Sequence, residues 1–158
     1  MYRNILLCYD GSKEGRNALT EGAEVALAMN AHTHLLAILR SSGADLAAES
    51  SGSSGPFHLH DEQQQATLRI LREGVEWLKA RNLNAQGQLV FGDPVSHIAT
   101  CARKLGCDLI VIGHRHRSRL ARWWSEDEDA TLLEQAPCSI LVASGAALPA
   151  APAKAGRR

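Results

Sequence analysis

Five short strand-like segments recur along the chain, and most of them are nearly continuous apolar runs. They lie at residues 4–9, 33–39, 85–91, 108–113 and 138–143. A strand with one solvent-exposed face alternates apolar and polar residues, whereas a continuous apolar run is typical of a strand buried on both faces. Strands of the second kind occur in parallel sheets that carry helices on both sides.

The segments between these strands have the features of helices. Ser12 is placed to cap a helix that begins at Lys13, and Pro94 is well placed at the start of another. Further helices are expected from Asp61, where apolar residues follow helical spacing, and over residues 127–135. The sequence therefore predicts an α/β fold built on a doubly wound, five-stranded parallel sheet.

One domain is expected over residues 1–143, because a chain of 158 residues is long enough for a single compact core. Within it, the Ser- and Gly-rich residues 41–60 predict a flexible loop. Residues 144–158 predict a disordered tail. Ligands of such sheets bind outside the carboxyl ends of the strands, so any site should involve the residues just after Tyr9, Ile38 and Ile112.

Composition excludes several classes of protein. Lys plus Arg and Asp plus Glu both number 17, which gives no overall bias toward nucleic acid or an anionic membrane. No apolar run approaches the ~18–20 residues of a membrane span. The four cysteines form no CxxC pair and are expected to be reduced, buried thiols. We therefore expect a soluble, cytoplasmic protein.

Three stretches resemble the universal stress protein family in their order and spacing, and together they span residues 2–143. They read "YRNILLCYDGSKEGRNAL", "GDPVSHIATCARKLGCDLIVIG" and "APCSILV". The resemblance implies a single-domain, bacterial-type member with a Rossmann-like fold of the adenine nucleotide alpha hydrolase-like kind. It also implies a homodimer through the last strand. Residues 138–143 suit that pairing, because they lack proline and charge and would promote aggregation if they formed an unpaired edge of the sheet.

Members of the family that bind ATP are expected to show Gly, two residues, Gly, nine residues, Gly, then Ser or Thr. Gly113 matches the first glycine, but His116 falls on the second and Glu126 on the third. Asp127 falls on the hydroxyl position. The resemblance therefore implies a degenerate phosphate site.

The adenine side of the family pattern is better preserved. Asp10 matches the acid that recognises adenine, Ile38 the apolar position that contacts the base, and Ile112 the apolar position before Gly113. With Arg115 and His116, these residues form the candidate adenine-nucleotide cleft.

Four consecutive acids, Glu126 to Asp129, stand where relatives hold phosphate. Like charges at ~4–6 Å repel by on the order of 1–4 kcal/mol per pair. The same acids also suit a helix start, because Ser125 and Glu128 fit a capping box.

The arginines of residues 115–122 leave three alternatives open. They could bind phosphate, pair with the acids Glu126 to Asp129, or form a nucleic-acid patch with Trp123 and Trp124. Pairing is favoured by the balance of charges.

The leading hypothesis is a non-catalytic stress-response or regulatory module that acts as a homodimer with an unidentified protein partner. No catalytic motif, resident metal, membrane contact or nucleic-acid partner is expected, and His58 with His60 is too small a ligand set to fix a metal site. No cofactor is expected in the leading hypothesis. The alternative is a protein that binds ATP or AMP and grips phosphates through the Arg115–Arg122 loop, with weak ATPase activity as a variant.

Overall fold

The structure is a computed structural model, and it describes residues 1–39, 57–113 and 126–144, without the side chains of 57–60 and 126–129. Five parallel strands form one sheet in the order β3-β2-β1-β4-β5. Their bounds are β1 Asn4–Cys8, β2 His32–Leu39, β3 Ala85–Phe91, β4 Leu109–Gly113 and β5 Ser139–Ala143. The predicted doubly wound parallel sheet is confirmed, and each strand lies within one residue of its expected bounds.

The strand order reverses direction beside β1. The chain runs from β1 through β2 to β3 on one side, and then crosses to β4 and β5 on the other. Residues Ile5 to Leu7 of β1 pair with Leu109 to Val111 of β4, and β1 also pairs with β2. The carboxyl ends of β1 and β4 therefore flank the switch point, which is where open α/β sheets bind ligands.

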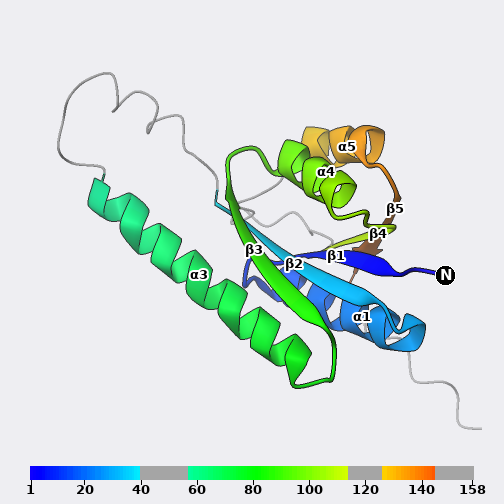
Figure 1. Ribbon diagram of the computed structural model, residues 1–158. Helices are drawn as coiled ribbons and strands as arrows, with labels where there is room; N and C mark the ends of the chain where they lie inside the picture. The colour runs from blue at the N-terminus through cyan, green and yellow to red at the C-terminus, as the bar shows by residue number, and fades with distance from the viewer. Residues whose placement is uncertain (40–56, 114–125, 145–158) are drawn as a thin grey trace, which may run out of the picture.

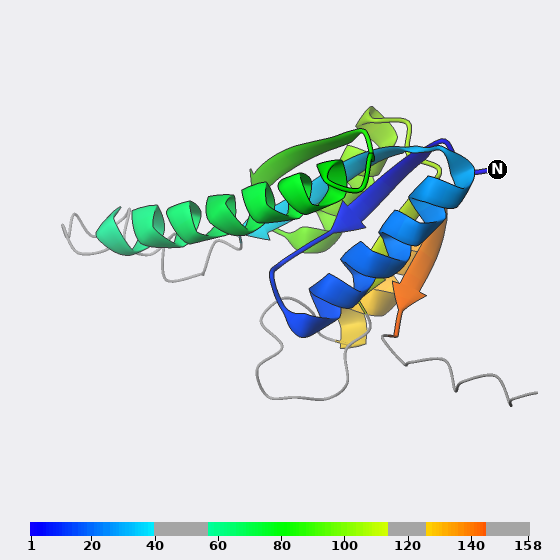
Figure 2. The ribbon, with the colours of Figure 1, turned by 90° about the horizontal axis from the view of Figure 1, so that it is seen from below.

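Helices cover both faces of the sheet (Figures 1 and 2). Helices α1, Lys13–Met29, and α3, Phe57–Lys79, pack on one face. Helices α4, Pro94–Lys104, and α5, Glu126–Gln135, pack on the other. Each face has its own apolar core, because alternate residues of a buried strand point to opposite sides.

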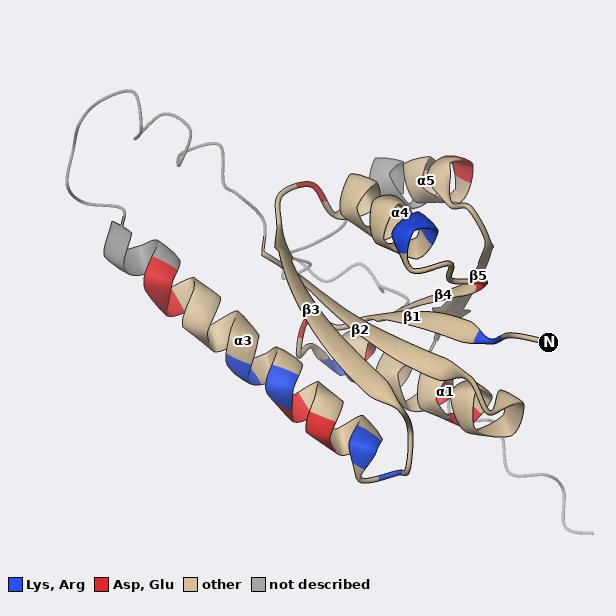
Figure 3. Ribbon diagram, in the orientation of Figure 1, with Lys and Arg blue, Asp and Glu red and all other residues tan. Residues whose placement is uncertain are grey.

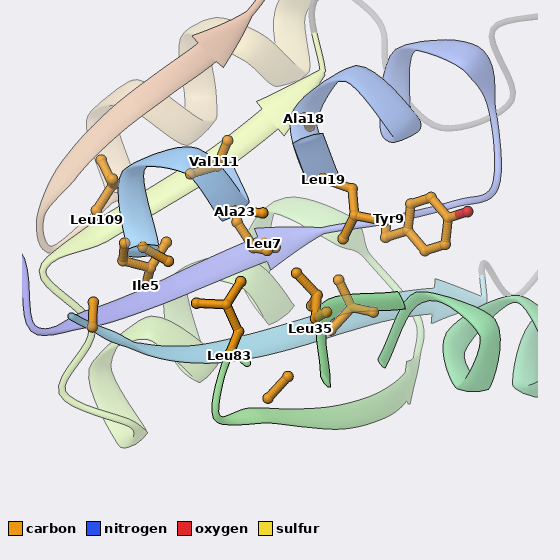
Figure 4. Close-up of a cluster of buried hydrophobic side chains, with 14 of the residues drawn as sticks. Ile5, Leu7, Tyr9, Ala18, Leu19, Ala23, Leu35, Leu83, Leu109 and Val111 are labelled. Atoms are coloured by element: carbon orange, nitrogen blue, oxygen red, sulfur yellow. The ribbon is translucent and has the colours of Figure 1, made fainter. Parts of the chain in front are cut away.

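The core under α1 is the larger of the two. Figure 4 shows the side chains of β1, β2 and β4 meeting those of α1, among them Leu7, Leu19 and Leu35. Leu7 and Leu35 have no exposed surface. Burying a leucine side chain of this kind stabilises a fold by about 1.5–3 kcal/mol. This packing fixes the start of α1 against the ends of β1 and β4.

The helix starts follow the predicted chemistry in two cases. Ser12 caps α1, because its side chain accepts a hydrogen bond from the Gly15 N–H, as expected. Asp93 caps α4 in the same way, through the Ser96 N–H, and Pro94 is the first helical residue.

Helix α3 begins at Phe57, so the expected start at Asp61 and the expected loop over 41–60 were wrong for residues 57–60. That expectation rested on Ser- and Gly-rich composition, which ends at Pro56, and Phe57 to His60 contain no residue that disfavours a helix strongly. The rest of that loop, the tail after residue 144 and the Arg115–Arg122 segment lie outside the described residues.

Charged side chains avoid the sheet. Figure 3 shows Lys, Arg, Asp and Glu mainly on the helices and on the turns that join the elements. Within the described ranges, no helix is long and apolar enough to cross a membrane.

Candidate ligand-binding cleft

A shallow cleft, of about 410 Å³ when the open solvent at its mouth is counted, lies at the carboxyl ends of β1 and β4, at the switch point of the sheet. The residues that line it come from β1, the β1–α1 turn, α1, β2, α4 and β4: Cys8, Tyr9, Asp10, Ser12, Glu14, Gly15, Leu36, Ile38, Ile98, Ile112 and Gly113. Four of the six predicted site residues, Asp10, Ile38, Ile112 and Gly113, are thus brought together.

Asp10 supplies the carboxylate of the cleft, and the turn after β1 positions it. The backbone N–H of Ser12 donates a hydrogen bond of 2.9 Å to Asp10 Oδ1, and the Ser12 hydroxyl donates one of 2.5 Å to the same oxygen. Between them, Gly11 has φ of +76°, a conformation that residues with a Cβ rarely adopt. The turn therefore needs glycine at 11.

Two isoleucines form apolar walls. Ile38 of β2 is 2% exposed and Ile112 of β4 is 7% exposed, and both belong to the core under α4. Leu36 and Ile98 extend this surface. Apolar walls beside the Asp10 carboxylate suit a flat, largely apolar ring that has a hydrogen-bond donor on its edge.

Gly113 has a structural reason to be glycine that is independent of phosphate. A Cβ at this position would lie 2.4 Å from the Glu14 carbonyl oxygen, which belongs to the first turn of α1. The first turn of α1 thus lies directly against the end of β4. The match of Gly113 to the family's first motif glycine is therefore weak evidence for a phosphate site.

Two residues that line the cleft, Cys8 and Tyr9, keep uncharged side chains at ordinary pH. Burial raises the pKa of the Cys8 thiol far above its usual range, and neighbouring Cys101 and Asp10 add to the shift. Burial also raises the pKa of Tyr9, although Arg16 offsets part of this effect through its charge and a hydrogen bond. Carboxylates on the cleft lining come from Asp10 and Glu14.

The remaining predicted site residues, Arg115 and His116, lie outside the described residues, so the phosphate side of the motif is not part of the described cleft. The predicted cap Ser125 also lies outside them, although α5 does begin at Glu126. Among the described residues, no group of three or more His, Cys, Asp or Glu is placed to hold a metal ion.

Sequence reasoning missed several residues of the cleft. Glu14 and Gly15 line it from the first turn of α1, and Ile98 lines it from α4. Helical spacing placed Ile98 on the inner face of its helix, but spacing alone does not say which strand end a helix residue faces. Ser12 was predicted as a helix cap, and its contact with Asp10 gives it a second partner.

The sequence matches the universal stress protein family over residues 1–144. The chain belongs to that family. A universal stress protein of Bacillus subtilis is 24% identical over 150 residues, which cover 90% of this chain and 99% of that protein.

Solved structures agree in fold. A universal stress protein from Lactobacillus plantarum has a TM-score of 0.71 at 21% identity, with 90% of this chain and 98% of that chain covered. A universal stress protein in complex with cAMP has a TM-score of 0.65 at 23% identity, covering 89% and 96%. One from Archaeoglobus fulgidus in complex with dAMP has a TM-score of 0.60 at 15% identity, covering 90% and 98%.

Proposed function

We propose that this universal stress protein is a non-catalytic stress-response module whose cleft binds the adenosine part of an adenine nucleotide with one phosphate, in preference to ATP. The observation that carries the proposal is the meeting of Asp10, Ile38 and Ile112 in one cleft at the switch point. An adenine ring has apolar faces and an amino group on its edge. The two isoleucines suit the faces, and the Asp10 carboxylate is placed to accept a hydrogen bond from the amino group.

Charge supports a ligand with few phosphates. Asp10 and Glu14 already line the cleft, and α5 begins with four acids in the sequence position where relatives are expected to hold phosphate. Each added phosphate brings more negative charge, and one unfavourable pair at ~4–6 Å costs on the order of 1–4 kcal/mol. Two structural neighbours are in complex with cAMP and with dAMP, which are adenine nucleotides with a single phosphate, and this supports the proposal.

A binding role is favoured over catalysis by the state of the polar groups in the described cleft. The Ser12 hydroxyl donates to Asp10 and accepts from the Gly15 N–H, so it is engaged as a helix cap. The Cys8 thiol has a raised pKa and is neutral, which makes it a poor nucleophile. Neither group is prepared for attack on a phosphate or an acyl carbon.

Thermal melting tests the proposal, because a ligand that binds only the folded state raises the melting temperature. Adenosine and AMP at millimolar concentration should raise it, and ATP should raise it less. Asp10→Ala should abolish the shift, whereas Asp61→Ala, an exposed acid on α3, should leave it intact. A larger shift with ATP than with AMP would favour a phosphate grip by the Arg115–Arg122 loop, and no shift with any of the three would refute binding in the cleft.

We further propose that the module is a homodimer joined through β5. In the described part of the chain, β5 is an edge strand that pairs only with β4. It contains no charged residue, and its Val142 is 45% exposed. An uncharged open edge favours pairing with another strand, and a second copy of the same edge is the simplest partner.

A further inference from the structure

Ser12 connects the start of α1 to the carboxylate of Asp10. Its backbone N–H and its hydroxyl both donate to Asp10 Oδ1, over 2.9 Å and 2.5 Å. Its hydroxyl oxygen also accepts a hydrogen bond of 2.9 Å from the Gly15 N–H. A helix cap needs only the last of these bonds. The two bonds to one oxygen hold the Asp10 side chain in a single orientation at the cleft.

Gly15 leaves the space in which that carboxylate lies. A Cβ at position 15 would lie 2.4 Å from Asp10 Oδ1 and 3.2 Å from the Ser12 hydroxyl. Gly15 lies in the first turn of α1, where alanine would favour the helix more than glycine does. Local helix stability therefore does not explain the glycine, whereas the position of Asp10 does.

We propose that Ser12 and Gly15 are positioning residues for the ligand, and that they make the cleft select a purine with an amino group over one with a carbonyl at the edge that meets Asp10. This inference rests on the proposed function. An ionised carboxylate only accepts hydrogen bonds and has about four acceptor positions, so Asp10 can hold Ser12 and still accept from a ligand. A carboxylate held in one orientation attracts an amino group, which donates a hydrogen bond, and repels a carbonyl oxygen, which is another acceptor.

A fixed acceptor discriminates better than a rotating one. A buried polar group that is left unpaired, or that faces another acceptor, opposes binding of the wrong ligand. A carboxylate that is free to turn could avoid the carbonyl oxygen at little cost. Loss of the Ser12 hydroxyl should therefore weaken adenosine binding and also reduce the preference for adenosine over inosine, which carries a carbonyl in place of the amino group.

The matched control is the other capped helix of the chain. Asp93 caps α4 through a hydrogen bond of 2.8 Å from the Ser96 N–H, but it does not line the cleft. Asp93→Ala removes a helix cap as Ser12→Ala does, so both variants should melt at a lower temperature than the wild type. Only Ser12→Ala should change ligand selection, and Ser12→Thr should restore it, because threonine keeps the hydroxyl.

Calorimetric titration with adenosine and with inosine measures this directly. We expect the wild type and Asp93→Ala to prefer adenosine equally. Ser12→Ala should bind adenosine roughly two- to tenfold more weakly, because the carboxylate must then be fixed on binding, and its adenosine-to-inosine ratio should be smaller. Equal affinities and ratios in Ser12→Ala and Asp93→Ala would overturn the inference. If the wild type binds neither nucleoside, both the proposed selectivity and the proposed function are wrong.

A second measurement needs no ligand and decides whether Asp10 is held as described. Gly15→Ala should lower the melting temperature of the wild type, because the new Cβ displaces the carboxylate. In an Asp10→Ala background the same change should cost less, because the 2.4 Å contact with Asp10 Oδ1 is gone and only the contacts of 3.2 Å and 3.3 Å with the Ser12 hydroxyl and the residue 10 backbone N remain. Equal changes in melting temperature in both backgrounds would show that Asp10 is not held against Gly15, and would overturn the inference whatever the ligand result.

Discussion

Glycines around the cleft show how one residue type can have two explanations. The family resemblance matches Gly113 to the first glycine of the expected phosphate motif, and in the structure glycine at this position prevents a collision with the backbone of Glu14. The colliding atom is a carbonyl oxygen, which a rotamer change cannot move away. Sequence alone supplied the first explanation, and only the packing of α1 against β4 supplies the second.

Gly113→Ala should therefore destabilise the protein in the absence of any ligand. We expect a loss of about 1–3 kcal/mol in the free energy of unfolding, as for other overpacked sites. Urea denaturation of the nucleotide-free protein measures it. Unchanged stability would show that glycine at 113 serves something other than this contact.

Buried thiols make stability depend on alkaline pH. Burial raises the pKa of Cys107 to about 12, and neighbouring Cys138 and Asp108 add to the shift. An unfolded cysteine has a pKa of about 8.5. Above that pH the unfolded chain loses a proton that the folded chain keeps, so the stabilising effect of the neutral thiol is complete below about pH 8.5 and declines as the pH rises toward 12.

Cys107→Ala should make the free energy of unfolding fall less steeply as the pH rises. Each pH unit above about 9 should lower the free energy of unfolding of the wild type by roughly 1 kcal/mol more than that of the variant. The cavity left by the substitution lowers stability equally at every pH, so it does not affect the slope. Urea denaturation at several pH values measures both slopes, and identical slopes would contradict the account.

At the scale of the elements, the strands were predictable because burial on both faces leaves a compositional signature. Two helix starts were predictable from a single residue: Ser12 caps α1, and Pro94 is the first residue of α4. The start of α3 was not, because the Ser- and Gly-rich segment before it suggested a longer loop than the fold contains. Figures 1 and 2 show the amino-terminal part of α3 extending past the sheet, which no spacing rule predicts.

The two parts of α3 should respond differently to proline. Glu62 and Glu76 are both exposed glutamates on this helix. Glu76 lies in the part that packs on β2 and β3, close to the fully buried Leu78, whereas Glu62 lies between exposed neighbours. Glu76→Pro should cost about 3 kcal/mol or more, and Glu62→Pro less than about 1 kcal/mol.

Chemical denaturation of the two variants tests this difference, with circular dichroism to follow the helix content. Equal losses would mean that the amino-terminal part of α3 contributes to the core as much as the carboxyl-terminal part does.

At the scale of the whole molecule, topology decides where the candidate site lies. The continuous strands and the family resemblance predicted a parallel sheet with a cleft at its carboxyl ends, and the order β3-β2-β1-β4-β5 places that cleft between β1 and β4. Which residues of α1 and α4 complete it depends on how the helices pack. Strand spacing does not fix that packing, so Glu14, Gly15 and Ile98 could not be predicted.

The proposed dimer belongs to this scale as well. Val142→Lys places a charge on the β5 edge and should convert a dimer to a monomer, because like charges would meet across a symmetric interface. Phe91→Lys is the matched control, because Phe91 is an exposed apolar residue, 51% accessible, on the opposite edge strand. Sedimentation velocity distinguishes the states. A monomeric wild type, or a Val142→Lys variant that still dimerises, would exclude the β5 interface.

Calorimetric titration of the wild-type protein with AMP and with ATP, in the same buffer, tests the central claim most directly. The account predicts that AMP binds and that ATP binds at least about fivefold more weakly, because one additional repulsive pair is worth on the order of 1 kcal/mol or more. Binding of ATP as tight as that of AMP, or no heat with either nucleotide, would contradict it.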